Sequence, residues 1–263
     1  MQLHFYKYQG TGNDFVIMDN RSGELDKLTE PQVKFLCDRR FGIGGDGLML
    51  LNKHPKYDFE MKYFNSDGRE SSMCGNGGRC LVQFAHDMGI EKSSYTFMAV
   101  DGLHEAEVAD EGTVSLKMND VEHINQMGRN YVLNTGSPHF VHLTEGVMHM
   151  DVFKKGRDIR YSNEYKAEGI NVNFVEQVGD GDRIIVRTYE RGVEDETLSC
   201  GTGVTAAALV CYHNDNGFNE VEVQTRGGRL SVEYDKVGDS FKNIWLTGPA
   251  VKVFEGTIEL KEL

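Results

Sequence analysis

The spacing of apolar residues along the first half of the chain predicts short strands interrupted by two helices. Residues 3–9 and 57–64 alternate between apolar and polar positions, as half-buried strands do. A helix is expected after Thr29, an N-cap residue with Pro31 following in the first turn. Further strands are expected at 15–19, 48–51, 95–100, 105–109 and 113–118. The pattern indicates a sheet-rich chain.

The two most apolar helices are each predicted to begin directly after a cysteine. After Cys74, apolar residues recur at helical spacing until Gly89 ends the helix: Leu81, Phe84, Ala85 and Met88. After Cys200, the run from Gly201 to Tyr212 is apolar on nearly every face. A helix with that composition is expected to be buried.

The two cysteine motifs belong to an internal repeat. Cys74 stands 28 residues before Gly102, and Cys200 stands 28 residues before Gly228. Upstream, T-G-N-D-F-V at 11–16 is echoed by T-G-S-P-H-F-V after Asn134. Matching motifs at matching spacing indicate a duplication in which each copy presents one cysteine.

The repeat predicts an α/β (α+β) protein of two pseudo-symmetric domains. Each domain is expected to wrap a curved, mostly antiparallel sheet around its own central helix. The N-terminal half is predicted to span residues 1–118 and to be completed by a C-terminal strand at 251–263. The C-terminal half is predicted to span 119–250.

Composition narrows the classes of partner. The 263-residue chain carries a formal net charge of −13 and has no Lys/Arg cluster, so a nucleic-acid partner is not expected. The N-terminus lacks a signal-peptide pattern and no apolar run approaches membrane-spanning length, which favours a cytoplasmic protein. The five cysteines are an odd number with no zinc-type spacing, so neither structural disulfides nor a metal site is expected. The glycine-rich stretch 39–47 follows a helix and precedes a strand, which is the wrong order for a dinucleotide-binding fingerprint.

A cysteine at a helix start is suited to acid–base chemistry. Unpaired N–H groups and the helix dipole favour the thiolate at Cys74 and Cys200. If the two sulfurs face one substrate, a thiolate can remove an α-proton while the other thiol returns a proton to the opposite face. Four backbone N–H groups could then stabilise the charge on the α-carboxylate: those of Gly75, Asn76, Gly201 and Thr202.

Buried cysteine is the alternative interpretation of any such residue. Free cysteine often behaves as a small hydrophobe, and this is the interpretation we give to Cys37, Cys80 and Cys211. The duplicated helix-start setting argues against it for the other two. No PLP, metal, nucleotide or other cofactor is called for by these motifs.

The motifs together resemble the diaminopimelate epimerase family. The resemblance rests on four segments: G-T-G-N-D-F (10–15), F-N-S-D-G-R-E-S-S-M-C-G-N-G-G-R-C (64–80), G-S-P-H (136–139) and Y-E-R-G-V-E-D-E-T-L-S-C-G-T-G (189–203). It implies a PLP-independent two-base epimerase that interconverts LL- and meso-2,6-diaminopimelate in lysine and peptidoglycan precursor biosynthesis. It also implies the diaminopimelate epimerase-like fold and a homodimer.

The resemblance also implies roles for individual residues. Cys74 is the donor and Cys200 the acceptor in the LL-to-meso direction, and His139 and Glu190 tune the two thiols. Substrate is bound by Asn13, Asn65, Gly75, Asn76, Asn173, Glu190, Arg191, Gly201 and Thr202. An arginine fork suits the distal carboxylate, and a glutamate suits an ammonium group. The chain departs from the common family pattern at Gly47 and Ser137, where Gln and Asn are frequent.

Two further functions are consistent with paired cysteines. A proline or hydroxyproline racemase of the same fold would use the same two-thiol chemistry but would need no fork for a distal carboxylate. A thiol redox or non-catalytic binding protein would form a Cys74–Cys200 disulfide as part of its activity, or would not turn over an amino acid. Glu190 and Arg191, together with Asn65 and Asn173, favour the diaminopimelate epimerase.

Overall fold

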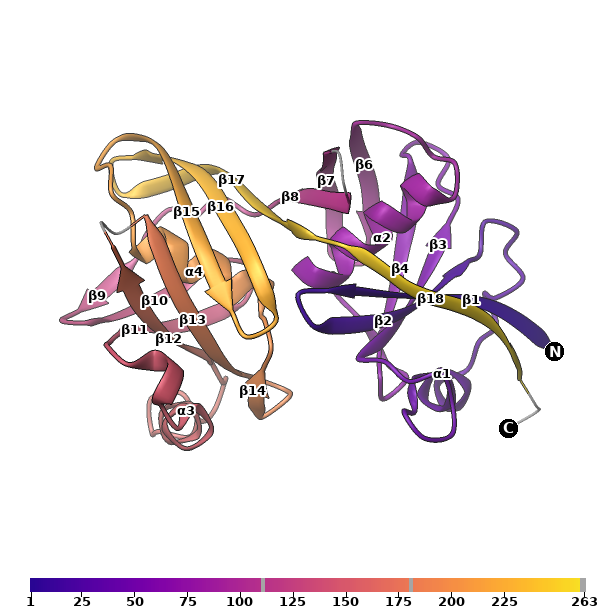
Figure 1. Cartoon of the computed structure of the whole chain (residues 1–263), viewed down its shortest axis with the longest axis horizontal. Coiled ribbons are helices and arrows are strands. Elements are labelled where there is room, and N and C mark those ends of the chain that lie inside the picture. Colours follow the sequence, from indigo (N-terminus) through magenta and orange to yellow (C-terminus); the bar gives the residue numbers. More distant parts are fainter. Residues whose placement is uncertain (110–111, 180–181, 261–263) are drawn as a thin grey trace. The chain divides into compact units, whose positions relative to one another are not determined.

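The computed structural model describes residues 1–109, 112–179 and 182–260, and the chain divides into two compact units. The first unit comprises Met1–Leu116 and Pro249–Leu263, and the second comprises Lys117–Gly248. The sequence-based boundaries lay two residues further along the chain, at residues 118 and 250. Each unit is a mostly antiparallel sheet with a helix against it, so the predicted α+β class is confirmed (Figure 1).

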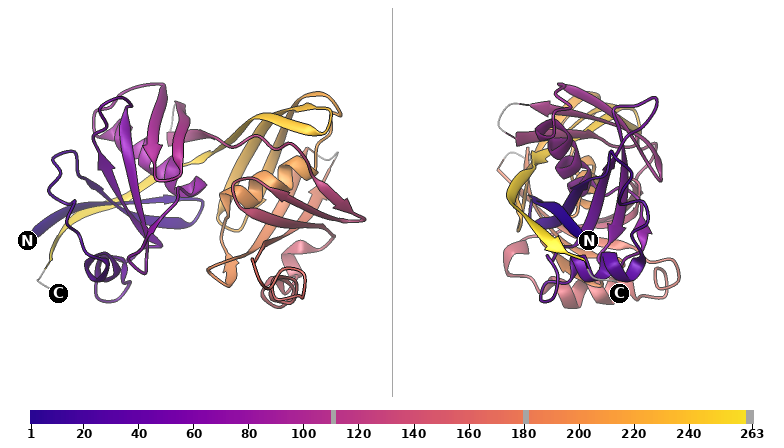
Figure 2. Two further views of the ribbon diagram at one scale, coloured as in Figure 1. Left: turned by 180° about the vertical axis from the view of Figure 1, so that it is seen from behind. Right: turned by 90° about the vertical axis from the view of Figure 1, so that its right-hand side faces the viewer.

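The first unit contains the elements of the first repeat and the last strand of the chain. They are β1 (Gln2–Gly10), β2 (Asn13–Asp19), α1 (Glu30–Cys37), β3 (Gly47–Asn52), β4 (Phe59–Asn65), β5 (Glu70–Ser71), α2 (Gly75–Asp87), β6 (Ser94–Ala99), β7 (Gly102–Ala109), β8 (Thr113–Lys117) and β18 (Val251–Glu259). The predicted N-cap of α1 is confirmed: Thr29 accepts from the N–H of Gln32, and Pro31 lies in the first turn. The Gln32 side chain accepts in return from the N–H of Thr29, which completes a capping box. β18 pairs antiparallel with β1, from Gln2 opposite Glu259 onward (Figure 2).

The second unit repeats this order. Its elements are β9 (Asn125–Met127), β10 (Asn130–Asn134), β11 (Pro138–Leu143), the 3-10 turn η2 (Val147–His149), α3 (Val152–Arg160), β12 (Asn171–Val178), β13 (Arg183–Glu190), β14 (Asp195–Thr197), α4 (Gly201–Val210), β15 (Gly217–Thr225), β16 (Gly228–Val237) and β17 (Ser240–Pro249). The helix predicted to reach Tyr212 ends at Val210, with Cys211 as its C-cap.

Strand pairing shows how complete the duplication is. In the first unit β2 and β3 pair in parallel, as do β4 and β6, whereas the pairs β1–β2, β3–β4, β6–β7 and β7–β8 are antiparallel. In the second unit the parallel pairs are β11 with β12 and β13 with β15. Each parallel pair is connected by a segment that contains a helix, α1 and α2 in one unit and α3 and α4 in the other. The predicted internal repeat therefore includes the α-helices α1 to α4: α3 corresponds to α1, and α4 corresponds to α2.

The cysteine helices are the crossover helices between the second parallel pair of each unit. α4 is buried over almost its whole length, and its central alanines allow the strands around it to approach closely. α2 is buried on all sides from Gly75 to Val82, and beyond that it buries Phe84 and Ala85. Each helix is followed by a two-stranded hairpin whose second strand begins at a left-handed glycine, Gly102 (φ 123°) or Gly228 (φ 146°). The glycine spacing seen in the sequence is thus a hairpin position.

Candidate active site

Cys74 is the N-cap of α2. Its backbone is extended, with φ −108° and ψ 146°, and its Sγ accepts a hydrogen bond from the N–H of Gly77 at 3.2 Å. Its carbonyl oxygen accepts the first intrahelical bond, from Gly78 at 2.7 Å. The sulfur therefore occupies the position that a capping oxygen usually takes, among the N–H groups at the positive end of the helix. That setting stabilises a thiolate.

Cys200 has the same position in the second unit. It is the N-cap of α4, and its carbonyl oxygen accepts from the N–H of Val204 at 2.8 Å. Its Sγ lies 3.5 Å from the hydroxyl oxygen of Thr202. Only 8% of its surface is exposed, whereas Cys74 is half-buried. Both cysteines are thus helix N-caps, as the sequence predicted, although the side-chain cap hydrogen bond seen at Cys74 has no counterpart at Cys200.

Glycine is required in the first turn of each cysteine helix. A Cβ at Gly77 would lie 3.0 Å from the sulfur of Cys74 and 3.3 Å from that of Met49. A Cβ at the equivalent Gly203 would collide with the side-chain oxygen of Asn173. The glycines of the two C-G-x-G motifs therefore let other groups approach the helix start closely.

Asn13 and Asn76 form an amide pair beside Cys74. Asn76 donates to the side-chain oxygen of Asn13, and Asn13 donates to Asp46 at 2.9 Å. Asn65 ends β4 opposite Gly47, and Ser66 donates its N–H to the carbonyl oxygen of Asp46 at 3.2 Å. The first unit therefore brings three predicted substrate-binding residues to one edge: Asn13, Asn65 and Asn76.

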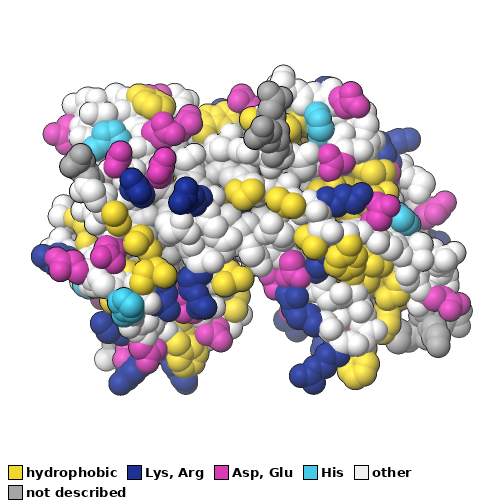
Figure 3. Space-filling model, viewed as in Figure 1, with side chains coloured by type: hydrophobic (Ala, Val, Ile, Leu, Met, Phe, Trp, Pro, Cys, Tyr) yellow, Lys and Arg dark blue, Asp and Glu magenta, His cyan; other side chains and the backbone are white. Residues whose placement is uncertain are grey.

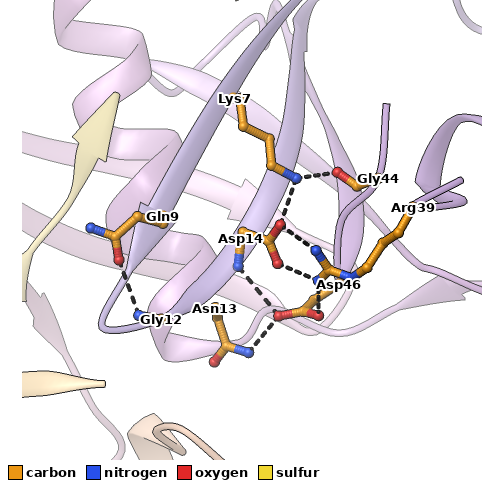
Figure 4. A network of polar contacts seen from close by, with 8 residues as sticks. All are labelled: Lys7, Gln9, Gly12, Asn13, Asp14, Arg39, Gly44 and Asp46. Carbon is orange, nitrogen blue, oxygen red and sulfur yellow. Dashed lines mark hydrogen bonds and ion pairs between the residues drawn. The ribbon is translucent and has the colours of Figure 1, made fainter. Parts of the chain in front are cut away.

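A charged network that the sequence did not reveal supports this edge (Figure 4). Arg39 binds Asp14 through both terminal nitrogens and also reaches Asp46 at 2.8 Å. Lys7 lies 2.7 Å from Asp14 and donates to the carbonyl of Gly44. Burial opposes ionisation of Asp14, but the hydrogen bonds and charges of Arg39 and Lys7 outweigh it and lower its pKa to about 2. These contacts hold the glycine-rich loop against β2.

Gly47, one of the two departures from the family pattern, has no room for a side chain. A Cβ there would lie 2.5 Å from the carbonyl oxygen of Phe64 and 2.5 Å from the ring of Tyr63. The tyrosine ring therefore fills the space beside β3.

His139 and Asn173 form a fully buried network under α4. Both are 0% exposed, and Asn173 lies 3.1 Å from the Nδ1 of His139. The same Asn173 amide donates to the carbonyl of Phe140 at 3.1 Å and accepts from the hydroxyl of Thr188 at 2.9 Å. Asn173 thus supports the first turn of α4 from inside the unit. It does not present its amide at the surface, where the sequence-based prediction had it contact substrate.

Asn171 was missed by the sequence analysis. Unlike Asn173, it contacts Ser137 and Arg191. It donates to the hydroxyl of Ser137 at 2.9 Å and accepts from the backbone N–H of Arg191 at 2.8 Å. The guanidinium of Arg191 is exposed and also reaches Ser137, at 3.4 Å. Glu190 precedes it as the last residue of β13. Because strand residues two apart share a face, the N-V-N pattern at 171–173 contained the signal for Asn171.

Burial keeps His139 neutral. Desolvation, with a smaller effect from the charge of Arg191, lowers the pKa of His139 to about 3. The unfolded chain therefore binds more protons than the folded one between about pH 6.5 and 3. The stability that this neutral ring contributes is complete above about pH 6.5 and is lost as the pH falls toward 3.

We expect the His139 ring to remain neutral at pH 5 in the folded protein, as measured by the 15N shifts of the imidazole. His139→Gln should reduce the loss of unfolding free energy between pH 6.5 and 4, measured by urea titration at each pH. A protonated ring at pH 5, or an unchanged acid limb in the variant, would contradict this account.

No helix within the described ranges is long and apolar enough to cross a membrane. Among the residues that the structure describes, no group of three or more His, Cys, Asp or Glu side chains is arranged to hold a metal ion.

Known proteins resemble this chain along most of its length. The family model described as diaminopimelate epimerase matches residues 5–124 and 131–253. The chain is 49% identical to the diaminopimelate epimerase of Flavobacterium psychrophilum over 97% of its length and 100% of the relative's. It is 44% identical to that of Chlorobaculum tepidum, over 95% and 99% of the two chains.

Solved structures share the fold at low sequence identity. A phenazine biosynthesis protein of the PhzF family from Bacillus anthracis has a TM-score of 0.77 at 16% identity, covering 99% of this chain and 100% of its own. A hydroxyproline epimerase from Agrobacterium vitis has a TM-score of 0.67 at 15% identity, covering 99% and 93%. At these sequence identities, the two structures show that the fold is shared, and no more than the fold.

Proposed function

The chain belongs to the diaminopimelate epimerase family, and from this premise we propose that Cys74 and Cys200 are the acid and base that invert the α-carbon. The enzyme is an isomerase that interconverts LL- and meso-2,6-diaminopimelate. One observation supports the residue assignment most strongly: each repeat has a cysteine as the N-cap of its crossover helix.

The proposed reaction needs one thiolate and one thiol. The thiolate takes the α-proton and becomes a thiol, while the other thiol gives its proton to the opposite face of the same carbon and becomes a thiolate. Atoms and charge balance, and the reverse direction exchanges the two roles. By family convention, Cys74 is the donor and Cys200 the acceptor from LL to meso.

The barrier in this reaction is the low acidity of the α-proton. Negative charge moves onto the α-carboxylate as the proton leaves, so hydrogen-bond donors aimed at that carboxylate stabilise the transition state. Helix-start N–H groups are suited to this: those of Gly75 and Asn76 and of Gly201 and Thr202. These backbone N–H groups stabilise the charge on the carboxylate without any side chain having to be protonated. This is consistent with a site in which the buried His139 is neutral.

Each unit offers side chains suited to substrate recognition. Asn13, Asn65 and Asn76 offer amides in the first unit. In the second unit, Arg191 suits the distal carboxylate and Glu190 the distal ammonium. We assign to Asn171, with Ser137, the contact predicted for Asn173, since Asn171 already bridges to Arg191. His139 and Asn173 then act by supporting α4.

A substrate panel tests this assignment. Purified enzyme without added cofactor is incubated with LL-diaminopimelate, L-proline and trans-4-hydroxy-L-proline, and products are resolved by chiral chromatography. We expect inversion of diaminopimelate alone. Turnover of either ring compound with no turnover of diaminopimelate would favour the racemase function instead.

We further propose that the enzyme works as a homodimer in the cytoplasm, where both thiols stay reduced. β18 pairs with β1, and it exposes three large apolar side chains: Val251 (45%), Val253 (55%) and Phe254 (47%). Figure 3 shows hydrophobic side chains gathered over this strand. Exposed apolar groups of this kind favour a protein–protein contact.

Phe254→Asp is expected to shift the protein from dimer to monomer in light scattering at micromolar concentration. Val237→Asp, at another exposed apolar position (60%), is the matched control and should leave the mass unchanged. A wild-type protein that is monomeric at those concentrations would contradict the proposal.

A further inference from the structure

Arg79 is a fully buried arginine behind the Cys74 helix start. It is 0% exposed and lies in the second turn of α2. Among residues 1–109, 112–179 and 182–260, no carboxylate oxygen forms an ion pair with its guanidinium. Burial lowers the pKa of Arg79 to about 10, which leaves it charged at neutral pH. A buried charge without a carboxylate partner is costly, so its retention needs a reason.

The guanidinium points back toward the N-terminus of its own helix. It donates to the carbonyl of Gly75 at 3.3 Å, to the side-chain oxygen of Asn76 at 2.9 Å and to the hydroxyl of Thr11 at 3.3 Å. A cation at this end opposes the helix dipole, so the arrangement is unfavourable for the helix itself. It concentrates positive potential at the start of the helix, where an anion would be stabilised.

The hairpin between β1 and β2 is shaped to receive this group. A Cβ at Gly10 would lie 3.1 Å from the carbonyl oxygen of Asn76 and 3.5 Å from the guanidinium. Thr11 adopts a left-handed φ of 48°, which is rare for a β-branched residue. Strain of this kind persists where surrounding contacts hold it, and here Thr11 contacts both Arg79 and Asn76.

The guanidinium lies at the helix start that Cys74 caps, because it donates to the carbonyl of Gly75, the residue that follows Cys74. Burial raises the pKa of Cys80 to about 12, so this thiol stays neutral. Cys74 is the thiol at the helix start itself, where its Sγ accepts from the N–H of Gly77 at 3.2 Å.

Several other charged groups near α2 pair with one another and not with Arg79. Asp101 accepts from the N–H of Met73 and lies 3.3 Å from His104. Other pairs on elements packed against α2 are Asp14 with Lys7 and Arg39, Asp46 with Arg39, Asp87 with Tyr8, and Lys252 with Glu255. β7 also carries Glu105 and Glu107, which are exposed.

The second repeat has a neutral residue where Arg79 stands. Thr205 occupies the equivalent position in α4, and its hydroxyl donates to the carbonyl of Gly201 at 3.0 Å. The same carbonyl position is thus bound by a cation in one unit and by a hydroxyl in the other. The two helix starts share their dipoles but differ by one buried charge.

We propose that Arg79 is a positioning residue of the Cys74 site, whose fixed charge favours the Cys74 thiolate and whose guanidinium orients the Asn13–Asn76 amide pair. The inference rests on the proposed role of Cys74. Because Arg79 takes the oxygen of Asn76, the nitrogen of that amide is directed to Asn13. One side chain thereby acts on both the thiol and the amides beside it.

Thiol alkylation tests the charge without requiring turnover. Wild-type, Arg79→Met and Thr205→Val proteins are treated with iodoacetamide across a pH series in the absence of substrate, and peptide mass spectrometry follows Cys74 and Cys200 separately. In Arg79→Met, the midpoint of Cys74 alkylation is expected to rise by about 1 pH unit. The Cys200 midpoint in the same samples, and the Cys74 midpoint in Thr205→Val, should not move.

Arg79→Gln removes the same charge and carries the test if Arg79→Met does not fold. Arg79→Lys should restore the midpoint of Cys74 alkylation toward wild type. KM for diaminopimelate should rise in this variant, because one ammonium group cannot make all the hydrogen bonds of the guanidinium to Asn76, Thr11 and Gly75. An unmoved Cys74 midpoint in the neutral variants, or an equal shift at Cys200, would overturn the inference. Cys74→Ala distinguishes the two proposals: if it retains turnover, the proposed function fails, whereas an unmoved midpoint in Arg79→Met with inactive Cys74→Ala defeats this inference alone.

Discussion

Alanine at Cys74 or at Cys200 should lower kcat/KM for epimerisation by about 10³-fold or more, since each variant loses one of the two proton-transfer groups. Neither substitution removes a large side chain, and the helix dipole and backbone donors remain. The fold is therefore expected to survive, as judged by circular dichroism and thermal unfolding. The rate is measured in both directions by chiral chromatography.

Cys211→Ala is the matched control for this pair. Cys211 is the C-cap of α4, is buried, and lies at the far end of the helix from Cys200. Burial raises its pKa to about 12, so it contributes no thiolate. Activity close to wild type is expected. Near-wild-type turnover in either of the other two variants would remove that cysteine from the mechanism.

Arg191→Met should lower kcat/KM for diaminopimelate by about 10²- to 10³-fold, mainly through KM, because a carboxylate loses its charged partner. The exposed guanidinium is held by the carbonyl of Glu168 at 3.1 Å and by Ser137 at 3.4 Å. These contacts orient it for a planar carboxylate. Arg191→Lys should recover only part of the loss, since an ammonium group cannot form the two parallel bonds.

Arg183→Met is the control for charge alone. Arg183 begins β13, the strand that ends just before Arg191; it is exposed and lies 3.8 Å from Glu222. Its removal should leave KM within about twofold, as expected for a surface ion pair. Equal losses in the two methionine variants would show that net charge, and not the predicted fork, governs binding.

Much of the fold could be predicted from the sequence because short motifs, each a few residues long, recur at the same spacing in the two halves of the chain. Cysteine before a glycine-rich helix start and glycine at a hairpin both recur at one spacing, and α2 and α4 follow from them. α3 was missed because its nine residues bury only Val152 and Gly156. Gly156 lowers helix propensity, yet a Cβ there would collide with the ring of Tyr189. The duplication itself was the available signal, since α1 has the equivalent place.

The site was less predictable where it depends on contacts between distant segments. Lys7, Asp14, Arg39 and Asp46 come from two strands and a loop, and no local pattern in the sequence joins them. Asn171 and Asn173 lie on one face of β12, and only burial tells which of them underlies α4. The neutral state of His139 likewise follows from its complete burial.

The most direct test of the two-thiol mechanism is proton exchange during a single inversion. Reduced enzyme without added cofactor is placed in deuterated water with LL-diaminopimelate, and the α-protons are followed by NMR. The account predicts deuterium at one α-carbon together with meso product, because the thiol that protonates the new face carries solvent deuterium. Meso product that retains its original α-proton in full, or no exchange by the reduced enzyme, would contradict it.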